Sequence, residues 1–140
     1  DFQVVFRLVL SCVLSGLIGL ERQLRHRAAG LRTHILVCLG STLIMLTSIY
    51  IFDIYKDKVS SDPARLAAGI ITGIGFLGAG TIIRYGEEVK GLTTAATMWS
   101  TAAVGTLAGL GLVKLAVVTA LIISGLLFLL TRIKTIGKKN

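Results

Sequence analysis

Charged residues are scarce in this sequence of 140 residues. Only 16% of the residues are Asp, Glu, Lys or Arg, whereas about a quarter of an average soluble protein is charged. Cysteine is scarce as well, because Cys12 and Cys38 are the only two, too few for a zinc pattern or a disulfide framework. We expect both to be small buried thiols. These shortages argue against a cytosolic enzyme and against a disulfide-stabilised secreted domain.

Sequence motifs of common catalytic centres are also missing. The chain has no Ser-x-x-Lys, Gly-x-Ser-x-Gly or His-Glu-x-x-His pattern. His26 and His34 have no carboxylate at metal-ligand spacing, so we expect no metal pair there. Residues 73–78 match Gly-x-Gly-x-x-Gly, but they lie inside an apolar run rather than after a strand, which excludes a dinucleotide fingerprint. The chain is therefore predicted not to be an enzyme.

Long apolar runs take up most of the chain, and 54% of the residues are hydrophobic. A transmembrane helix requires about 20 mostly apolar residues, because the hydrocarbon core is roughly 30 Å thick. A soluble core of this size cannot bury five such runs. We therefore predict an all-α polytopic membrane bundle of about five transmembrane helices, forming a single domain over residues 1–140. The predicted spans are residues 2–20, 33–52, 66–83, 91–113 and 115–131.

The distribution of Lys and Arg predicts the orientation of the bundle. The loops at 21–32 and 84–90 and the C-terminal tail, which includes Lys138 and Lys139, together carry 10 basic residues, whereas the other side carries 4. The positive-inside rule then places the N-terminus outside and the C-terminus in the cytoplasm. The net charge of +8 thus marks one membrane face and does not indicate a nucleic-acid partner. Because the sequence starts at Asp1 rather than Met, we expect it to be trimmed, with residues missing beyond either end.

Several local signals mark where helices begin and end. Residues 109–111, Gly-Leu-Gly, precede Lys114 and predict a tight turn between the last two spans. Asp62 followed by Pro63 predicts a helix start, with Asp62 as N-cap rather than as a functional carboxylate. Arg7 lies early in the first span, where we expect it to extend to the outer surface or, alternatively, to pair with a carboxylate.

The five spans differ in composition. Residues 115–131 are rich in Leu, Ile and Val and are suited to face lipid. The spans at 66–83 and 91–113 are rich in small and hydroxyl residues, so we expect both in the interior, in close contact with other helices. The hydroxyls of 91–113 either bond within the bundle, which we favour, or line a polar cavity. We expect Trp99 to serve packing. The glycines predicted to pack helices are Gly69, Gly73, Gly75, Gly78, Gly80, Gly105 and Gly109.

Charged residues at the inner ends of the spans form a candidate site. Glu21 and Arg25 have the i,i+4 order of a helical ion pair. The functional alternative is one polar cluster on the cytoplasmic side, where arginine suits phosphate, lipid headgroups or a partner's carboxylate. Support for Mg²⁺ as a cofactor or ligand is weak, because the carboxylates lie in loops or at span ends. The predicted cluster contains Glu21, Arg22, Arg32, His34, Arg84, Thr93 and Thr94.

Three sequence blocks resemble the MgtC/SapB family of membrane domains. The first is Gly-Leu-Glu-Arg at 19–22 with Ala-Gly-Leu-Arg-Thr-His at 29–34. The second is Asp-Pro-Ala-Arg at 62–65 with Thr-Gly-Ile-Gly-Phe-Leu-Gly-Ala-Gly at 72–80. The third is Gly-Leu-Thr-Thr-Ala-Ala-Thr-Met-Trp at 91–99. The blocks come in the order of the family. Carried over by this resemblance, the candidate ion- or partner-binding residues are Glu21, Arg22, Arg32, Thr33, His34, Asp62, Arg65, Arg84, Thr93 and Thr94.

The resemblance implies a multi-pass protein of the bacterial inner membrane that is linked to growth at low Mg²⁺ and to virulence. Members of the family carry labels as Mg²⁺ transporter components, and some are thought to restrain the F-type ATP synthase or to bind other membrane proteins. We expect a non-enzymatic regulator that acts through helix contacts, either in a homo-oligomer or with such a partner. The alternative is a transporter or channel component for Mg²⁺ or another ion. Four arginines in the 21–32 loop add anionic lipid as a further expected partner.

Overall fold

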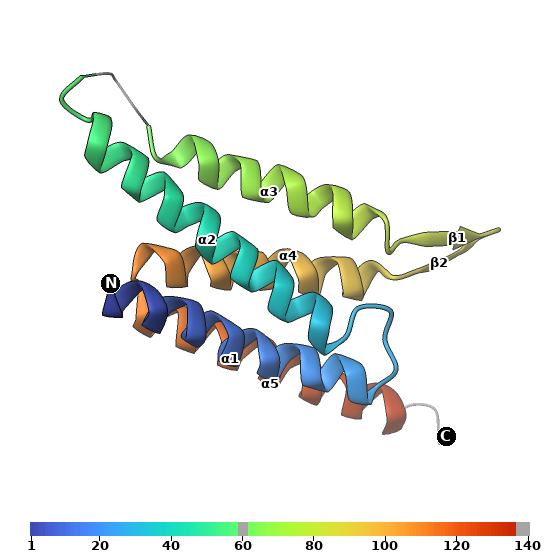
Figure 1. The fold of residues 1–140 in the computed structure, drawn as a ribbon. Coiled ribbons are helices and arrows are strands. Elements are labelled where there is room, and N and C mark those ends of the chain that lie inside the picture. The colour runs from blue at the N-terminus through green and yellow to red at the C-terminus, as the bar shows by residue number, and fades with distance from the viewer. Residues whose placement is uncertain (59–61, 137–140) are drawn as a thin grey trace.

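The computed structural model contains five helices and one β-hairpin (Figure 1). It describes residues 1–58 and 62–136, the side chains of 134–136 excepted, so Lys138 and Lys139 of the predicted basic tail lie outside the described residues. The all-α class predicted from the sequence is confirmed. The elements are α1 (Phe2–Leu24), α2 (Leu31–Tyr55), α3 (Ala64–Ala79), β1 (Ile83–Tyr85), β2 (Glu88–Lys90), α4 (Leu92–Leu110) and α5 (Val113–Ile136).

Three of the helices are long and apolar enough to cross a membrane. They are α1, α2 and the Val113–Ile133 part of α5, whereas α3 is a shorter apolar helix of 16 residues. Successive helices run in opposite directions, so residue 1 and the end of α5 lie at opposite ends of the bundle (Figure 1). The chain therefore has the up-and-down arrangement expected of a multi-pass membrane protein.

Helix α4 is the centre of the bundle, because it packs against all four other helices. Its buried Val104 and Ala108 join Ile18 of α1 and Ala116 of α5 in one apolar cluster. The opposite face of α4 contacts α3 through Met98 and other buried residues. The small side chains that the sequence places in this helix are what allow so many neighbours to approach it.

Two glycines of α4 bring it into direct contact with the backbone of α2. A Cβ added at Gly109 would lie 2.7 Å from Met45 Cβ and 2.9 Å from the carbonyl oxygen of Thr42. At Gly105 it would collide with the carbonyl group of Cys38. The same contact carries a hydrogen bond, in which Thr42 Oγ1 donates to the Gly105 carbonyl over 2.9 Å. Glycine is thus required at both positions by the closeness of the two helices.

The tight turn between α4 and α5 lies where the sequence predicts it. Helix α4 ends at Leu110, and Gly111 adopts the left-handed conformation, with φ of 82°. Arg7 of α1 reaches this turn, and its Nη1 donates to the Gly109 carbonyl over 2.9 Å. Arg7 therefore extends toward the end of the bundle at which the chain begins, as expected, and no ion pair joins it to a carboxylate within the described residues. Its positive charge caps the C-terminal end of α4, where the helix dipole is negative.

The region of the third predicted span differs from the prediction in two respects. The span was expected to run over 66–83 in the interior, but α3 ends at Ala79 and lies at the edge of the bundle, against α2 and α4. Residues 83–90, expected to be the end of this span and a loop, instead form a hairpin in which Tyr85 pairs with Glu88. The physical reason is the two-residue turn at 86–87, where Gly86 has a positive φ that suits a hairpin.

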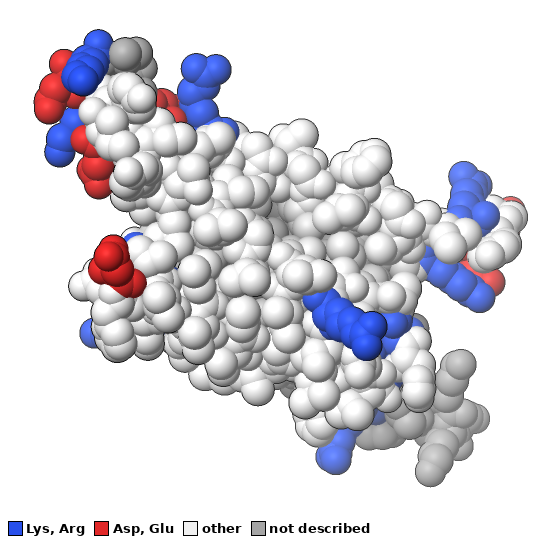
Figure 2. Space-filling model, viewed as in Figure 1, with Lys and Arg blue, Asp and Glu red and all other residues white. Residues whose placement is uncertain are grey.

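Charged side chains lie at the two ends of the bundle, with an uncharged band between them (Figure 2). One end, which we call the arginine-rich end, comprises the α1–α2 loop, the hairpin and the end of α5. The opposite end comprises residue 1, the α2–α3 loop and the α4–α5 turn. The α1–α2 loop, the hairpin and the end of α5, which the positive-inside rule assigns to the same side of the membrane, thus lie at the same end of the bundle.

We predict that Gly105→Ala lowers the free energy of unfolding by about 1–3 kcal/mol, because its Cβ would force α2 and α4 apart. The measurement is denaturant unfolding of the purified protein in mixed micelles, followed by circular dichroism. Gly125→Ala on α5 is the matched control, since nothing lies within 4 Å of a Cβ there. It should leave stability unchanged or raise it through helix propensity. Equal stability of the two variants would contradict the prediction.

Candidate functional site

Arg22 is the central residue of a polar cluster at the arginine-rich end. It lies in the last turn of α1, and only 3% of its side chain is exposed. Its Nη2 donates to Thr94 Oγ1 of α4 over 3.4 Å, and its Nη1 lies 3.8 Å from Glu21 Oε2. Its Nε is buried without a hydrogen-bond partner among the described residues. A buried arginine requires such partners, because an uncompensated charge is unfavourable in an apolar environment.

Glu21 is shared between two arginines. It forms the ion pair with Arg25 that the i,i+4 spacing predicts, and it also lies beside Arg22. The side chain of Glu21 is 13% exposed, against 28% for Arg25. Glu21 thus partly neutralises a group of arginines that remains positive overall.

His34 lies next to this group because α1 and α2 approach closely at Gly19. A Cβ at Gly19 would lie 2.8 Å from the Leu31 Cα and 3.0 Å from His34 Cβ. His34 is fully buried, and its Nδ1 is 2.8 Å from the Gly30 carbonyl, which indicates that Nδ1 carries the proton. Its Nε2 has no partner within the described part of the chain.

Only some of the residues predicted to form the polar cluster lie together in the structure. Glu21, Arg22, His34 and Thr94 do form one cluster, and Thr93 borders Arg22 across a groove. Arg84 lies apart, because its Nε donates to the Gly86 carbonyl within the hairpin over 2.8 Å. The other candidates are also outside the cluster, namely Arg32 and Thr33 at the start of α2, and Asp62 and Arg65 at the opposite end of the bundle.

Asp62 has a structural role at the start of α3. Its Oδ1 accepts a hydrogen bond from the Ala64 N–H over 2.8 Å. The helix begins at Ala64, one residue later than the Asp62-Pro63 pattern predicts. Asp62 therefore makes the predicted capping contact, although the helix begins one residue later than predicted. A difference of one residue is within the usual variation of helix boundaries.

A groove runs beside Arg22 between α5 and the ends of α1 and α4. Its polar wall includes Arg27 and Thr93, and its apolar wall comes from α5. Sequence reasoning counted Arg27 only as a loop charge and treated α5 as lipid-facing throughout. The predicted topology could have indicated that Arg27 and α5 lie near each other, because it places the first loop and the end of the last span on the same side of the membrane. The groove is lined by Arg22, Arg27, Thr93, Leu126, Leu127, Leu130 and Thr131.

A second candidate site lies along α3, where three glycines face open space. Apart from the backbone of α3 itself, no heavy atom of the described residues lies within 4 Å of a Cβ built at Gly69, Gly73 or Gly75. Gly78 is the one that contacts a neighbouring helix, with Ala95 Cβ at 3.5 Å, whereas a Cβ at Gly80 would meet only the carbonyls of its own helix end. Gly69, Gly73 and Gly75 therefore do not serve packing within the described chain, whereas Gly78 packs against α4.

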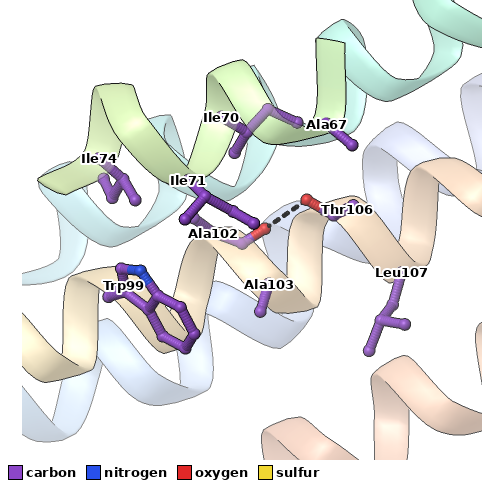
Figure 3. A pocket seen from close by; sticks show the side chains of 9 residues that line it. All are labelled: Ala67, Ile70, Ile71, Ile74, Trp99, Ala102, Ala103, Thr106 and Leu107. Carbon is purple, nitrogen blue, oxygen red and sulfur yellow. Dashed lines mark hydrogen bonds between the residues drawn. The ribbon is translucent and has the colours of Figure 1, made fainter. Parts of the chain in front are cut away.

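Grooves flank α3 on both sides. The groove towards α2 contains Gly69, Gly73 and also Gly40, a third glycine with an open Cβ position that the sequence analysis did not select. The groove towards α4 is almost wholly apolar and has Ile71 on one wall and Ala103 on the other (Figure 3). Trp99 borders this second groove and is half exposed.

Four hydroxyls of α4 form hydrogen bonds within their own helix. Thr97, Ser100, Thr101 and Thr106 each donate to the carbonyl four residues earlier, over 2.6 to 3.0 Å. Figure 3 shows the bond from Thr106 to Ala102. Among the residues described, no group of three or more His, Cys, Asp or Glu could hold a metal ion.

These features define the class of the protein as a polytopic helical membrane protein, and the comparisons with known sequences specify the family. The model of the MgtC family matches residues 8–136, so the chain belongs to the MgtC family. It is accordingly a multi-pass protein of the bacterial inner membrane. No solved structure matches the chain significantly.

Curated relatives match the chain over most of its length. Protein MgtC of Brucella suis is 50% identical over 113 residues, which are 79% of this chain and 44% of the relative. Protein MgtC of Salmonella typhimurium LT2 is 46% identical over 123 residues, 87% of this chain and 50% of the relative. A protein called putative magnesium transporter YhiD, from Escherichia coli K12, is 46% identical over 117 residues, 82% and 54% respectively. The chain thus spans about half the length of the curated relatives it matches.

We predict that Thr94→Val destabilises the protein by about 1–2 kcal/mol, because the isosteric change removes an acceptor from the buried Arg22 guanidinium. Thr93→Val is the matched control, since the neighbouring Thr93 is exposed and should tolerate the same change. Both variants are compared by unfolding in a zwitterionic detergent. A Thr94→Val protein as stable as the control would show that the hydrogen bond contributes nothing.

Proposed function

We propose that this protein is a non-enzymatic membrane regulator that acts through helix contacts made by the groove between α2 and α3. The observation that carries the proposal is the open space above Gly40, Gly69 and Gly73 in that groove. The partner helix comes from a second copy of the chain or from a membrane protein such as the F-type ATP synthase. A role of this kind fits a protein linked to Mg²⁺ homeostasis and virulence through its family.

The physical argument starts from what glycine does in a membrane helix. Glycine is less favourable than alanine in a helix by about 1 kcal/mol, and a glycine facing lipid gains no packing in return. In lipid, small residues favour association because they let two backbones approach. Gly105 and Gly109 fulfil this role inside the chain, whereas Gly40, Gly69 and Gly73 have no protein neighbour there. A helix from outside the chain would give these three positions the same role.

The position of α3 supports the same proposal. Within the described residues, its main contacts are with α2 and α4, and its buried residues are Ile70, Ile74 and Gly78. Its remaining surface is open, including Ile71, which is 54% exposed, and Phe76, which is 82% exposed. The small residues on the outer surface of α3 leave grooves, and the large ones form ridges, so that a partner helix can interlock with both.

We predict that Gly73→Leu abolishes association and cellular function but keeps the fold, because the new side chain fills the groove from open space. Gly125→Leu is the matched control, since it makes the same change at an open position of α5, away from the groove. Self-association is measured by energy transfer between labelled copies in liposomes, and function by growth of a deletion strain at low Mg²⁺. If Gly73→Leu behaves like the control in both assays, the proposed surface is wrong.

The same variants identify the partner. If the wild-type protein self-associates and Gly73→Leu does not, the groove joins two copies. If the wild-type protein stays monomeric but co-purifies with the F-type ATP synthase, and the Gly73→Leu variant does not, the groove binds that partner. Each result is read against Gly125→Leu, which should match the wild type.

The alternative function, ion transport along a polar face of α4, predicts a path that the hydroxyls would line. Thr97, Ser100, Thr101 and Thr106 each donate to a carbonyl of their own helix, so these hydroxyls do not need water or an ion to satisfy their donors. Helix α4 also contains no carboxylate, the ligand that Mg²⁺ sites in proteins usually include. We therefore predict no Mg²⁺ flux above that of empty vesicles when the purified protein is placed in liposomes with an internal Mg²⁺ dye. Flux that depends on the protein and on the gradient would favour the transporter, a function that the name of the YhiD relative states for that protein.

A further inference from the structure

The groove beside Arg22 has a polar half and an apolar half. Its polar half is formed by the guanidinium groups of Arg22 and Arg27 and by Thr93, and its apolar half by Leu126 and Leu130 with neighbouring residues of α5. Its volume is about 250 Å³. It lies at the arginine-rich end, between the last turns of α1 and α5 and the first turn of α4. A ligand that fits both halves must itself have a polar end and an apolar end.

Arg22 provides an unusual binding group within this groove. The residue is 97% buried, yet it lines the groove, and its Nε has no hydrogen-bond partner among the residues described. Its two other nitrogens are directed to Thr94 and Glu21. The charge of Arg22 is only partly compensated, because Glu21, the carboxylate nearest to it, lies 3.8 Å away and is shared with Arg25. An anion in the groove that Arg22 lines would add to this compensation.

The electrostatics of the groove favour an anion. Arg22, Arg25 and Arg27 carry three positive charges near the groove, and Glu21 is the one carboxylate paired with them among the described residues. Thr93 is the second residue of α4, so the groove also borders the N-terminus of a 19-residue helix. That end carries unpaired backbone N–H groups and the positive end of the helix dipole, both of which attract negative oxygen atoms.

We propose that this groove binds an anionic phospholipid, with the headgroup phosphate between Arg22, Arg27 and Thr93 and an acyl chain along the leucines of α5. Arginine matches phosphate oxygens in geometry and charge, and basic pockets between membrane helices on one side of a bilayer are typical of lipid sites. The apolar wall favours a lipid over free phosphate, because free phosphate would leave the leucines without a contact. The site is separate from the α2–α3 groove, so the two proposals succeed or fail independently.

Lipid titration followed by native mass spectrometry tests this site on the purified protein. The probes are phosphatidylglycerol, phosphatidylcholine with the same acyl chains, and inorganic phosphate. We expect the wild-type protein to bind phosphatidylglycerol more tightly than phosphatidylcholine. Arg27→Gln, a change at an exposed residue that should not affect folding, is expected to weaken the binding of phosphatidylglycerol about fivefold, the usual effect of one basic group near an anionic lipid.

Arg84→Gln is the matched control, because Arg84 is an exposed arginine at the same end that lies in the hairpin, outside the groove. It should bind phosphatidylglycerol like the wild type. Equal affinity for both lipids would overturn the proposal, because it would show no preference for a negative headgroup. Equal loss in the two variants would also overturn it, because that result indicates general attraction to the basic surface. Displacement of the lipid by inorganic phosphate, or by a short acidic peptide, would overturn it too, by assigning the groove to a different ligand.

Discussion

The close contact between α2 and α4 is the constraint on which the rest of the bundle depends. Helices in lipid gain nothing from hydrophobic burial against one another, so their association relies on packing and on interhelical hydrogen bonds. Gly105 and Gly109 provide that packing, and Thr42 provides a hydrogen bond across it. With α2 and α4 joined, α1 and α5 cover one side of α4, and α3 is left on the outer side of the pair.

The arrangement separates two uses of glycine in one chain. A neighbouring helix of the same molecule packs against Gly105 and Gly109, whereas the space next to Gly40, Gly69 and Gly73 is open. The polar residues are divided in a similar way. Four hydroxyls of α4 donate to carbonyls of their own helix, whereas Arg22 and His34 each retain a buried nitrogen without a partner in the described chain. The contact between α2 and α4 is thus closely packed, whereas open space remains along α3 and unpaired buried nitrogens remain at the arginine-rich end.

Much of this architecture could be predicted from sequence, because apolar length and glycine spacing act locally. The helices, the turn before Lys114 and the Glu21–Arg25 pair all follow from such local patterns. The place of α3 could not, since its composition is the same whether its neighbours come from this chain or from another. The groove beside Arg22 could not be predicted either. It is lined by both Arg27 and Leu130, and their proximity depends on how α1 and α5 pack.

The hydrogen bond from Arg7 to the Gly109 carbonyl links residues that are 102 positions apart. A chain made from its N-terminus places Arg7 near the membrane long before Gly109 exists, so during biogenesis this arginine depends on water or headgroups for its solvation. Only when the turn between α4 and α5 has formed does the guanidinium obtain its acceptor. The depth of Arg7 in the membrane is therefore fixed by a contact that forms only after α4 has been made and packed against α1.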